Sequence, residues 1–260
     1  MNELRAVDTG SALKQLARAA YEYAACSGSL ALFALLCLAW SLLALPLYAL
    51  LPRTLGRRLG RLGIMLVFRL YTDWLEGIGA YRLDLSALET LRGEGALILA
   101  PNHPSLIDAV LIAAHVDDLS CVMKSELMGN ILLGPGARLA RYIRNGSPRQ
   151  MVRAAVAELR AGGRLLLFPE GTRTMRGPIN ALTRSVGVIA RHAQVPVQTL
   201  LFETDSNFLG KGRPLWARPS LPIRYRVRLG RRFDPPRDPE AFRLELEHYF
   251  CIELQPPSCP

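Results

Sequence analysis

The sequence predicts an α/β fold, a mixed, largely parallel sheet flanked by helices, behind an N-terminal hydrophobic segment. Two observations carry this prediction. Short apolar runs alternate with segments of helical periodicity from about residue 79 onward, a pattern typical of parallel strands joined by helices. A long stretch without charge precedes them. With 260 residues, the chain can form one sizeable core with an N-terminal appendage.

The first element is apolar enough to enter a membrane. No charge lies between Glu22 and Arg53, and residues 30–51 form an apolar run of 22 residues. About 20 apolar residues suffice to cross a bilayer core. We expect a membrane helix; Pro46 and the neighbouring aromatic residues keep a re-entrant hairpin open. A buried core helix is the other alternative, whereas the acids before the run and the lack of a cleavage site disfavour a signal peptide.

Charge predicts how this segment is oriented. Residues 53–69 contain five arginines and no acid, whereas residues 1–29 balance three basic against three acidic side chains. If the segment spans a membrane, the positive-inside tendency places the following domain on the cytoplasmic side. The apolar patch 62–68 is too short to span, so we expect it in the interface or over the core.

The remaining elements alternate along the chain. Strands are expected near residues 79–85, 96–100, 119–123, 164–168, 195–201 and 223–229, and helices over 105–116, 148–161, 181–193 and 240–254. Residues 1–75 then form a membrane-associated region, residues 76–255 the α/β domain and residues 256–260 a tail.

An imidazole and a carboxylate stand in fixed register after the second strand. His103 and Asp108 are five positions apart, about 140° around a regular helix, and therefore point in different directions if one helix holds both. They meet only if His103 precedes the helix and Asp108 lies in its first turns. Pro104 favours this arrangement, because it holds His103 extended and can begin a helix. The pair is thus expected at the sheet edge where α/β proteins bind ligands.

A simpler interpretation exists for each residue. Ser105 and Asp108 also match a capping box, in which a serine begins the helix and an acid three positions later bonds back to it. His103 alone is compatible with an ordinary surface histidine.

A polar turn follows the fourth strand. In Phe168–Thr174, Gly171 permits close backbone approach, Thr172 offers a hydroxyl, and Arg173 offers a guanidinium suited to phosphate. The alternative is a plain Pro-Glu-Gly turn that ends in a surface arginine.

Together, the two segments resemble a known family. The His-x-x-x-x-Asp spacing of 102–108 and the Phe-Pro-Glu-Gly-Thr-Arg of 168–173 resemble the first and third blocks of the glycerolipid acyltransferases, which include bacterial 1-acylglycerol-3-phosphate acyltransferase. Residues 142–144 resemble the second block, 195–197 the fourth, and 124–127 the segment between the first two. The blocks stand in the family's order and imply that residues 76–255 are an acyltransferase domain.

The chemistry of these residues fits acyl transfer from a thioester to an alcohol. A histidine can take the hydroxyl proton, and a carboxylate on its far nitrogen fixes the tautomer and stabilises the imidazolium. His103 is the expected base and Asp108 its orienting partner. The resemblance implies that a further set holds the substrate: Asn102, Lys124, Arg144, Glu170, Gly171, Thr172 and Arg173.

The expected reaction moves a fatty acyl group from acyl-CoA or acyl carrier protein to a lysolipid hydroxyl, foremost 1-acylglycerol-3-phosphate, giving phosphatidic acid. An ornithine-type lysolipid or an aryl polyene-type lipid is an alternative acceptor. A non-catalytic, membrane-docked lipid-binding protein is the alternative class. No cofactor is expected, and the cysteine spacing indicates no metal site.

A basic stretch follows the fourth block. Residues 211–232 contain eight basic side chains and no acid, and Arg224, Arg226 and Arg228 alternate with apolar residues as on a strand with one charged face. Docking on an anionic leaflet, guarding of an edge strand, and attraction of an acidic carrier protein all remain open. Nucleic acid is not expected, because no binding module accompanies the charge.

Overall fold

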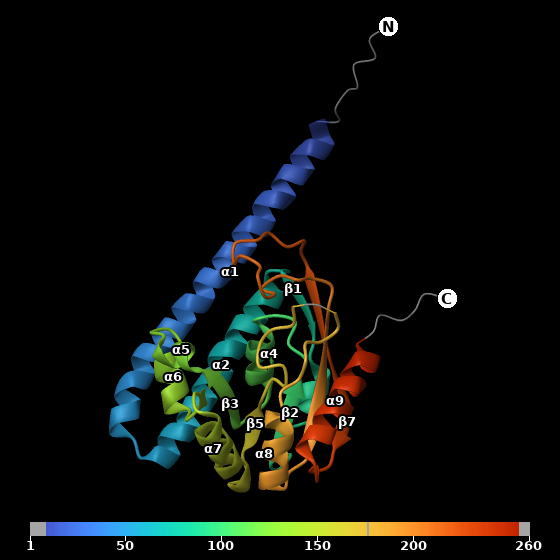
Figure 1. Cartoon of the computed structure of the whole chain (residues 1–260). Coiled ribbons are helices and arrows are strands. Elements are labelled where there is room, and N and C mark those ends of the chain that lie inside the picture. Colours follow the sequence, from blue (N-terminus) through green and yellow to red (C-terminus); the bar gives the residue numbers. More distant parts are fainter. Residues whose placement is uncertain (1–8, 176, 255–260) are drawn as a thin grey trace.

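The computed structural model describes residues 9–175 and 177–254, so the expected tail lies outside the described residues. A seven-stranded sheet forms its centre (Figure 1). Its strands are β1 (Tyr81–Asp84), β2 (Leu97–Pro101), β3 (Leu119–Lys124), β4 (Ile143–Asn145), β5 (Arg164–Leu166), β6 (Val197–Thr204) and β7 (Ile223–Phe233). Their order is β1-β7-β6-β2-β5-β3-β4. All pairs are parallel except β6–β7, which confirms the predicted mixed, largely parallel sheet.

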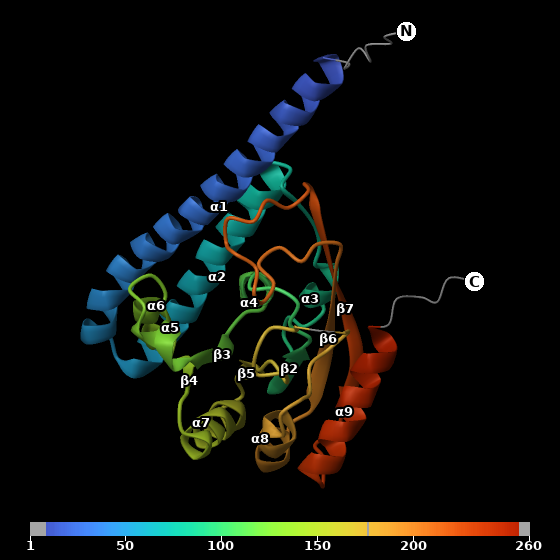
Figure 2. The same cartoon turned by 45° about the horizontal axis from the view of Figure 1, so that its top comes forward.

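Helices cover both faces of this sheet. They are α1 (Thr9–Leu50), α2 (Arg53–Gly77), α3 (Ser86–Glu89), α4 (Asp108–His115), α5 (Ser125–Gly129), α6 (Gly134–Leu139), α7 (Pro148–Arg160), α8 (Ser185–Ala193) and α9 (Pro239–Glu253). One buried cluster joins the sheet to α2 and α4, and a second joins it to α7, α8 and α9. Figure 2 shows the sheet between these two layers, with α1 outside α2.

The apolar N-terminal segment is one unbroken helix. α1 continues through Pro46, so the described residues contain no re-entrant turn within residues 30–51. By length and composition α1 can cross a membrane, and only 17% of its most apolar window is buried, unlike a core helix. It contacts α2 and α6 on one side, where the Ser41 hydroxyl donates to the carbonyl of Leu132 at 2.6 Å. Leucines such as Leu35 and Leu42 remain exposed.

The patch 62–68 belongs to α2, a 25-residue amphipathic helix that covers the core. Ile64 and Tyr71 are buried, whereas Leu66 is exposed. A buried guanidinium fixes the position of the helix, since Nη1 of Arg61 lies 2.8 Å from Oε1 of Glu158 on α7. α2 is longer than the predicted patch by more than two turns at each end. α1 packs against it.

Two expectations for helix starts were wrong by a few residues. α4 begins at Asp108 rather than residue 105, because the preceding turn is held by other hydrogen bonds. α8 begins at Ser185 rather than residue 181. The N–H of Leu182 donates to Glu247 instead, and that of Thr183 to the carbonyl of Pro169. Strand β4 was not predicted, because three residues are too few to show the alternation of apolar and polar side chains that indicates a strand.

The arginines of β7 do not guard an edge. β7 lies between β1 and β6, and β1 is the edge strand. Acids on neighbouring elements pair with these arginines: Arg226 lies 3.4 Å from Asp84, and Arg228 lies 2.6 Å from Glu203. The charged face predicted for this strand is therefore largely neutralised within the fold.

Candidate active site

Parallel pairing brings the two sequence segments to one edge of the sheet. β2 pairs with β5 and β6, and β5 pairs with β3, so the carboxyl ends of these parallel strands point the same way. His103 follows β2, and residues 168–173 follow β5. Lys124 ends β3 and Arg144 lies in β4, which is parallel to β3. The predicted residues thus share one edge, the edge at which open α/β sheets bind ligands.

His103 and Asp108 meet as the spacing predicted. Nδ1 of His103 lies 2.8 Å from Oδ2 of Asp108, which is the first residue of α4. The imidazole is 13% exposed and the carboxylate is fully buried. We assign the proton to Nδ1, because an ionised carboxylate only accepts. Nε2 then keeps its lone pair and makes no hydrogen bond to the described residues.

Asp108 also completes half of the capping box. Its Oδ2 accepts the N–H of Ser105 at 2.8 Å, whereas the Ser105 hydroxyl donates to the carbonyl of Phe208 and does not cap α4. The catalytic and capping interpretations therefore describe the same oxygen. Burial raises the pKa of Asp108 by more than its hydrogen bonds from His103 and Ser105 lower it. A carboxylate with a raised pKa is a strong acceptor for an imidazole N–H.

The turn after β5 holds the main chain and ring of His103. The His103 N–H donates to Oε1 of Glu170 at 3.0 Å, and its carbonyl accepts the N–H of Thr174 at 2.7 Å. The imidazole stacks on Phe168, with ring centroids 3.7 Å apart. The N–H of Asn180 and the Thr174 hydroxyl also donate to Glu170, each at 2.8 Å. We call His103, Phe168, Glu170 and Thr174 the histidine clasp.

Two residues expected to bind substrate are hydrogen-bonded within the protein. Glu170 is 5% exposed, and both of its carboxylate oxygens accept hydrogen bonds, from His103 and Thr174 of the clasp and from Asn180. Asn102 is 4% exposed and uses its whole amide on Phe202: Nδ2 donates to the carbonyl at 3.1 Å, and Oδ1 accepts the N–H at 2.7 Å. Substrate binding by either residue stays a prediction. Within the protein, both residues hold the site in position. The side-chain amide of Asn102 continues the hydrogen bonding between β2 and β6 beyond the end of β2.

The rest of the turn is more accessible. Gly171 is exposed with φ +66°, a conformation that favours glycine. Thr172 and Arg173 are half-buried. Nη1 of Arg173 donates to the carbonyls of Leu209 and Gly210, at 2.6 and 3.1 Å. A guanidinium has five N–H donors, so Arg173 retains others for a ligand.

Lys124 and Arg144 lie further along the same edge. Both are exposed, and they are neighbours across β3 and β4, where Lys124 is paired with Asn145 and Met123 with Arg144. In the described part of the chain, neither side chain is hydrogen-bonded to the clasp. The sheet therefore brings them to the correct edge without joining them to the His103 pair.

Sequence reasoning left out several residues that hold the site. Phe168 and Thr174 were inside the quoted turn, but their contacts with His103 depend on the strand order and have no sequence signal. Asn180 acts through its backbone N–H, which carries no side-chain signature, whereas the bond from the Ser105 N–H was implied by the capping box.

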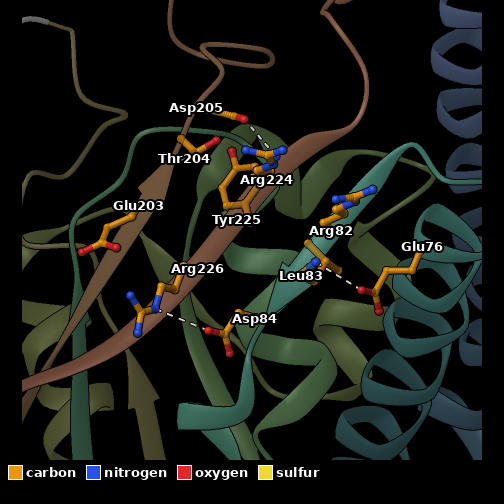
Figure 3. A pocket seen from close by; sticks show the side chains of 10 residues that line it. All are labelled: Glu76, Arg82, Leu83, Asp84, Glu203, Thr204, Asp205, Arg224, Tyr225 and Arg226. Carbon is orange, nitrogen blue, oxygen red and sulfur yellow. Dashed lines mark hydrogen bonds and ion pairs between the residues drawn. The ribbon is translucent and has the colours of Figure 1, made fainter.

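A separate charged depression of about 590 Å³ lies over β1, β6 and β7 (Figure 3). None of the predicted site residues lines it. Its acids are engaged locally: Asp84 pairs with Arg226, and Asp205 accepts the N–H of Arg224. This depression is therefore separate from the candidate active site.

Comparison with known proteins agrees with this geometry. Residues 82–203 match the acyltransferase family, a range that holds the His103–Asp108 pair and the whole clasp. These residues therefore form an acyltransferase domain, in agreement with the family that the two sequence segments resemble. The fold resembles the crystal structure of PlsC, the 1-acyl-sn-glycerophosphate (LPA) acyltransferase from Thermotoga maritima, with a TM-score of 0.64 and 21% sequence identity. The likeness covers 93% of this chain and 95% of the other.

Replacing Asn102 tests its positioning role. Asn102→Ala leaves the N–H and carbonyl of Phe202 unpaired in the core, so we expect the free energy of unfolding to fall by about 2 kcal/mol. Denaturant unfolding in detergent micelles measures this loss, and the Phe202 amide should exchange its hydrogen faster. Asn207→Ala, at an exposed asparagine, is the matched control. Equal stability of both variants would refute the role.

Proposed function

We propose that the protein is a membrane-bound O-acyltransferase that moves a fatty acyl group from acyl-CoA or acyl carrier protein to a lysolipid hydroxyl. The foremost acceptor is 1-acylglycerol-3-phosphate, and the product is phosphatidic acid. The observation that carries the proposal is the 2.8 Å contact between His103 Nδ1 and Asp108, which leaves Nε2 free at the sheet edge.

The proposed reaction needs no enzyme nucleophile. Nε2 of His103 takes the proton of the acceptor hydroxyl while its oxygen attacks the thioester carbonyl. The new C–O bond forms, the C–S bond breaks, and the proton passes to the departing thiolate. Asp108 stabilises the imidazolium between these steps and prevents the ring from turning, as a buried carboxylate does in other catalytic pairs.

The acceptor's phosphate fits the accessible donors beside the clasp. The Thr172 hydroxyl, the main chain at Gly171 and the remaining N–H groups of Arg173 supply hydrogen bonds and charge. Arg144 and Lys124 add positive charge further along the same edge. The Thermotoga maritima protein of similar fold is a 1-acyl-sn-glycerophosphate acyltransferase, which supports this choice of acceptor.

The N-terminal helices would hold the enzyme at its lipid substrate. α1 exposes leucines along the side that faces away from α2 and α6, and α2 exposes Leu62, Leu66 and Leu70. These apolar surfaces favour attachment to a bacterial inner membrane, on its cytoplasmic side, where the acyl donors are found.

Loss of the base should abolish turnover. Purified protein in vesicles would receive labelled acyl-CoA or acyl carrier protein and a panel of lysolipids, including lysophosphatidic acid and an ornithine-type lysolipid. His103→Ala should lower turnover by about 10²–10⁴-fold, because the acceptor proton loses its base. Membrane association should remain.

His192→Ala is the matched control, since His192 is exposed on α8 and bonds the carbonyl of Val188. Wild-type turnover by the His103 variant would contradict the base assignment and favour a non-catalytic lipid-binding protein. Turnover of another lysolipid without turnover of lysophosphatidic acid would change the acceptor only.

Glu170 distinguishes positioning from substrate binding. In Glu170→Gln, an amide NH2 must face one of the donors His103, Thr174 or Asn180, so the clasp loosens. We expect kcat to fall by about 10–100-fold with little change in the acceptor KM, because small displacements of catalytic groups are costly. Glu126→Gln, an exposed acid on α5, is the control. A raised KM with unchanged kcat would instead indicate direct contact with the acceptor.

A further inference from the structure

The loop between β6 and β7 presents an exposed tip on two buried roots. The near root, residues 208–210, and the far root, Leu221, are buried, whereas every residue of the tip, Lys211–Trp216, is exposed. A backbone hydrogen bond from Ala217 to the carbonyl of Pro214 turns the chain at the end of the tip. The exposed side chains are therefore presented by a folded loop.

The tip exposes two large apolar side chains in succession. Trp216 is 73% exposed, and Leu215 is 49% exposed. A single exposed leucine is common on soluble proteins. An exposed tryptophan beside it is a costly surface in water but a favourable one at a membrane interface, where the amphipathic indole lies at the headgroup level.

The charge around the tip is positive and unbalanced. Lys211 and Arg213 precede the apolar pair, and no acid occurs over residues 206–233. Within the described residues neither side chain has an ion-pair partner, in contrast to Arg226 and Arg228 on the strand that follows. A bilayer with anionic lipids would attract these two free charges.

The far root of the loop is attached to the proposed membrane helix. The carboxylate of Glu22 on α1 accepts the N–H of Leu221 at 3.3 Å and lies 3.5 Å from Arg218. Arg18 donates to the carbonyl of Leu221 at 3.3 Å. Figures 1 and 2 both show the loop, in orange, beside α1. These contacts lie on the charged part of α1 that precedes the apolar run 30–51, so the tip emerges near the start of that run.

The near root is attached to the active site. The carbonyl of Phe208 accepts from the Ser105 hydroxyl at 2.9 Å, and the carbonyl of Leu209 accepts from Leu106 at 3.1 Å and from Arg173 at 2.6 Å. The loop thus connects α1 to both segments that form the site.

We propose that Lys211–Trp216, the interfacial tip, docks on the surface of an anionic lipid bilayer. Leu215 and Trp216 enter the boundary between headgroups and acyl chains, and Lys211 and Arg213 lie at lipid phosphates. Because the near root contacts Ser105 and Arg173, docking sets the active site at the bilayer surface that supplies the acceptor. The inference rests on the proposed function only in presuming a membrane-bound enzyme.

Tryptophan quenching tests the docking directly. The full chain would be reconstituted in vesicles of phosphatidylglycerol and phosphatidylcholine with brominated acyl chains, and no acyl donor is added. The difference between wild type and Trp216→Tyr isolates the emission of Trp216 from that of Trp40 and Trp74. We expect this emission to be blue-shifted, quenched by bromines near the headgroups and protected from aqueous acrylamide.

Charge variants supply the second arm. Lys211→Gln/Arg213→Gln should lower the ratio of inserted to aqueous tip by about tenfold or more, whereas Arg149→Gln/Arg153→Gln on exposed positions of α7 should not. Acrylamide quenching as strong as that of free tryptophan, with no effect of brominated lipid, would overturn the proposal. Protection that requires added acidic carrier protein would also overturn it. Since no catalysis is measured, failure of the acyl-transfer assay would leave this result intact.

Discussion

The hold on His103 is the constraint on which the site depends. A histidine acts as a base only where its proton-accepting nitrogen faces the substrate, and a free ring rotates. Here Asp108 fixes Nδ1 from one side, Phe168 lies against the ring face, and Glu170 with Thr174 binds both polar groups of the main chain. Every rotatable bond that would turn Nε2 away is thereby restrained.

The fold makes this arrangement possible by strand order. β2 lies between β5 and β6. His103, which follows β2, therefore has the turn after β5 on one side and strand β6 on the other. The first neighbour supplies the clasp. The second is joined to β2 by Asn102, whose amide replaces a backbone pair with Phe202. The residues that surround the histidine are thus held in place by the sheet, although they are distant in sequence.

Much of this could be predicted from the sequence, for physical reasons. Apolar periods identified most strands, and the five-residue spacing with Pro104 implied that His103 precedes a helix which Asp108 begins. The hydrogen bonds of Asn102 and Glu170 could not be predicted, because an amide or a carboxylate that is buried among protein groups has the same side chain as one that binds substrate. The β7 arginines were equally ambiguous, since their acidic partners lie on β1 and β6. Such pairings depend on tertiary contacts that no local pattern encodes.

Nitrogen NMR of histidine-labelled protein tests the central claim most directly. The spectrum of His103, assigned by its loss in the alanine variant, reports which ring nitrogen carries the proton in the neutral form. The account predicts a proton on Nδ1, shared with Asp108, and an unprotonated Nε2; Asp108→Asn should disturb this state. A neutral His103 protonated on Nε2 would contradict the account, because that nitrogen would have no lone pair with which to accept the acceptor's proton.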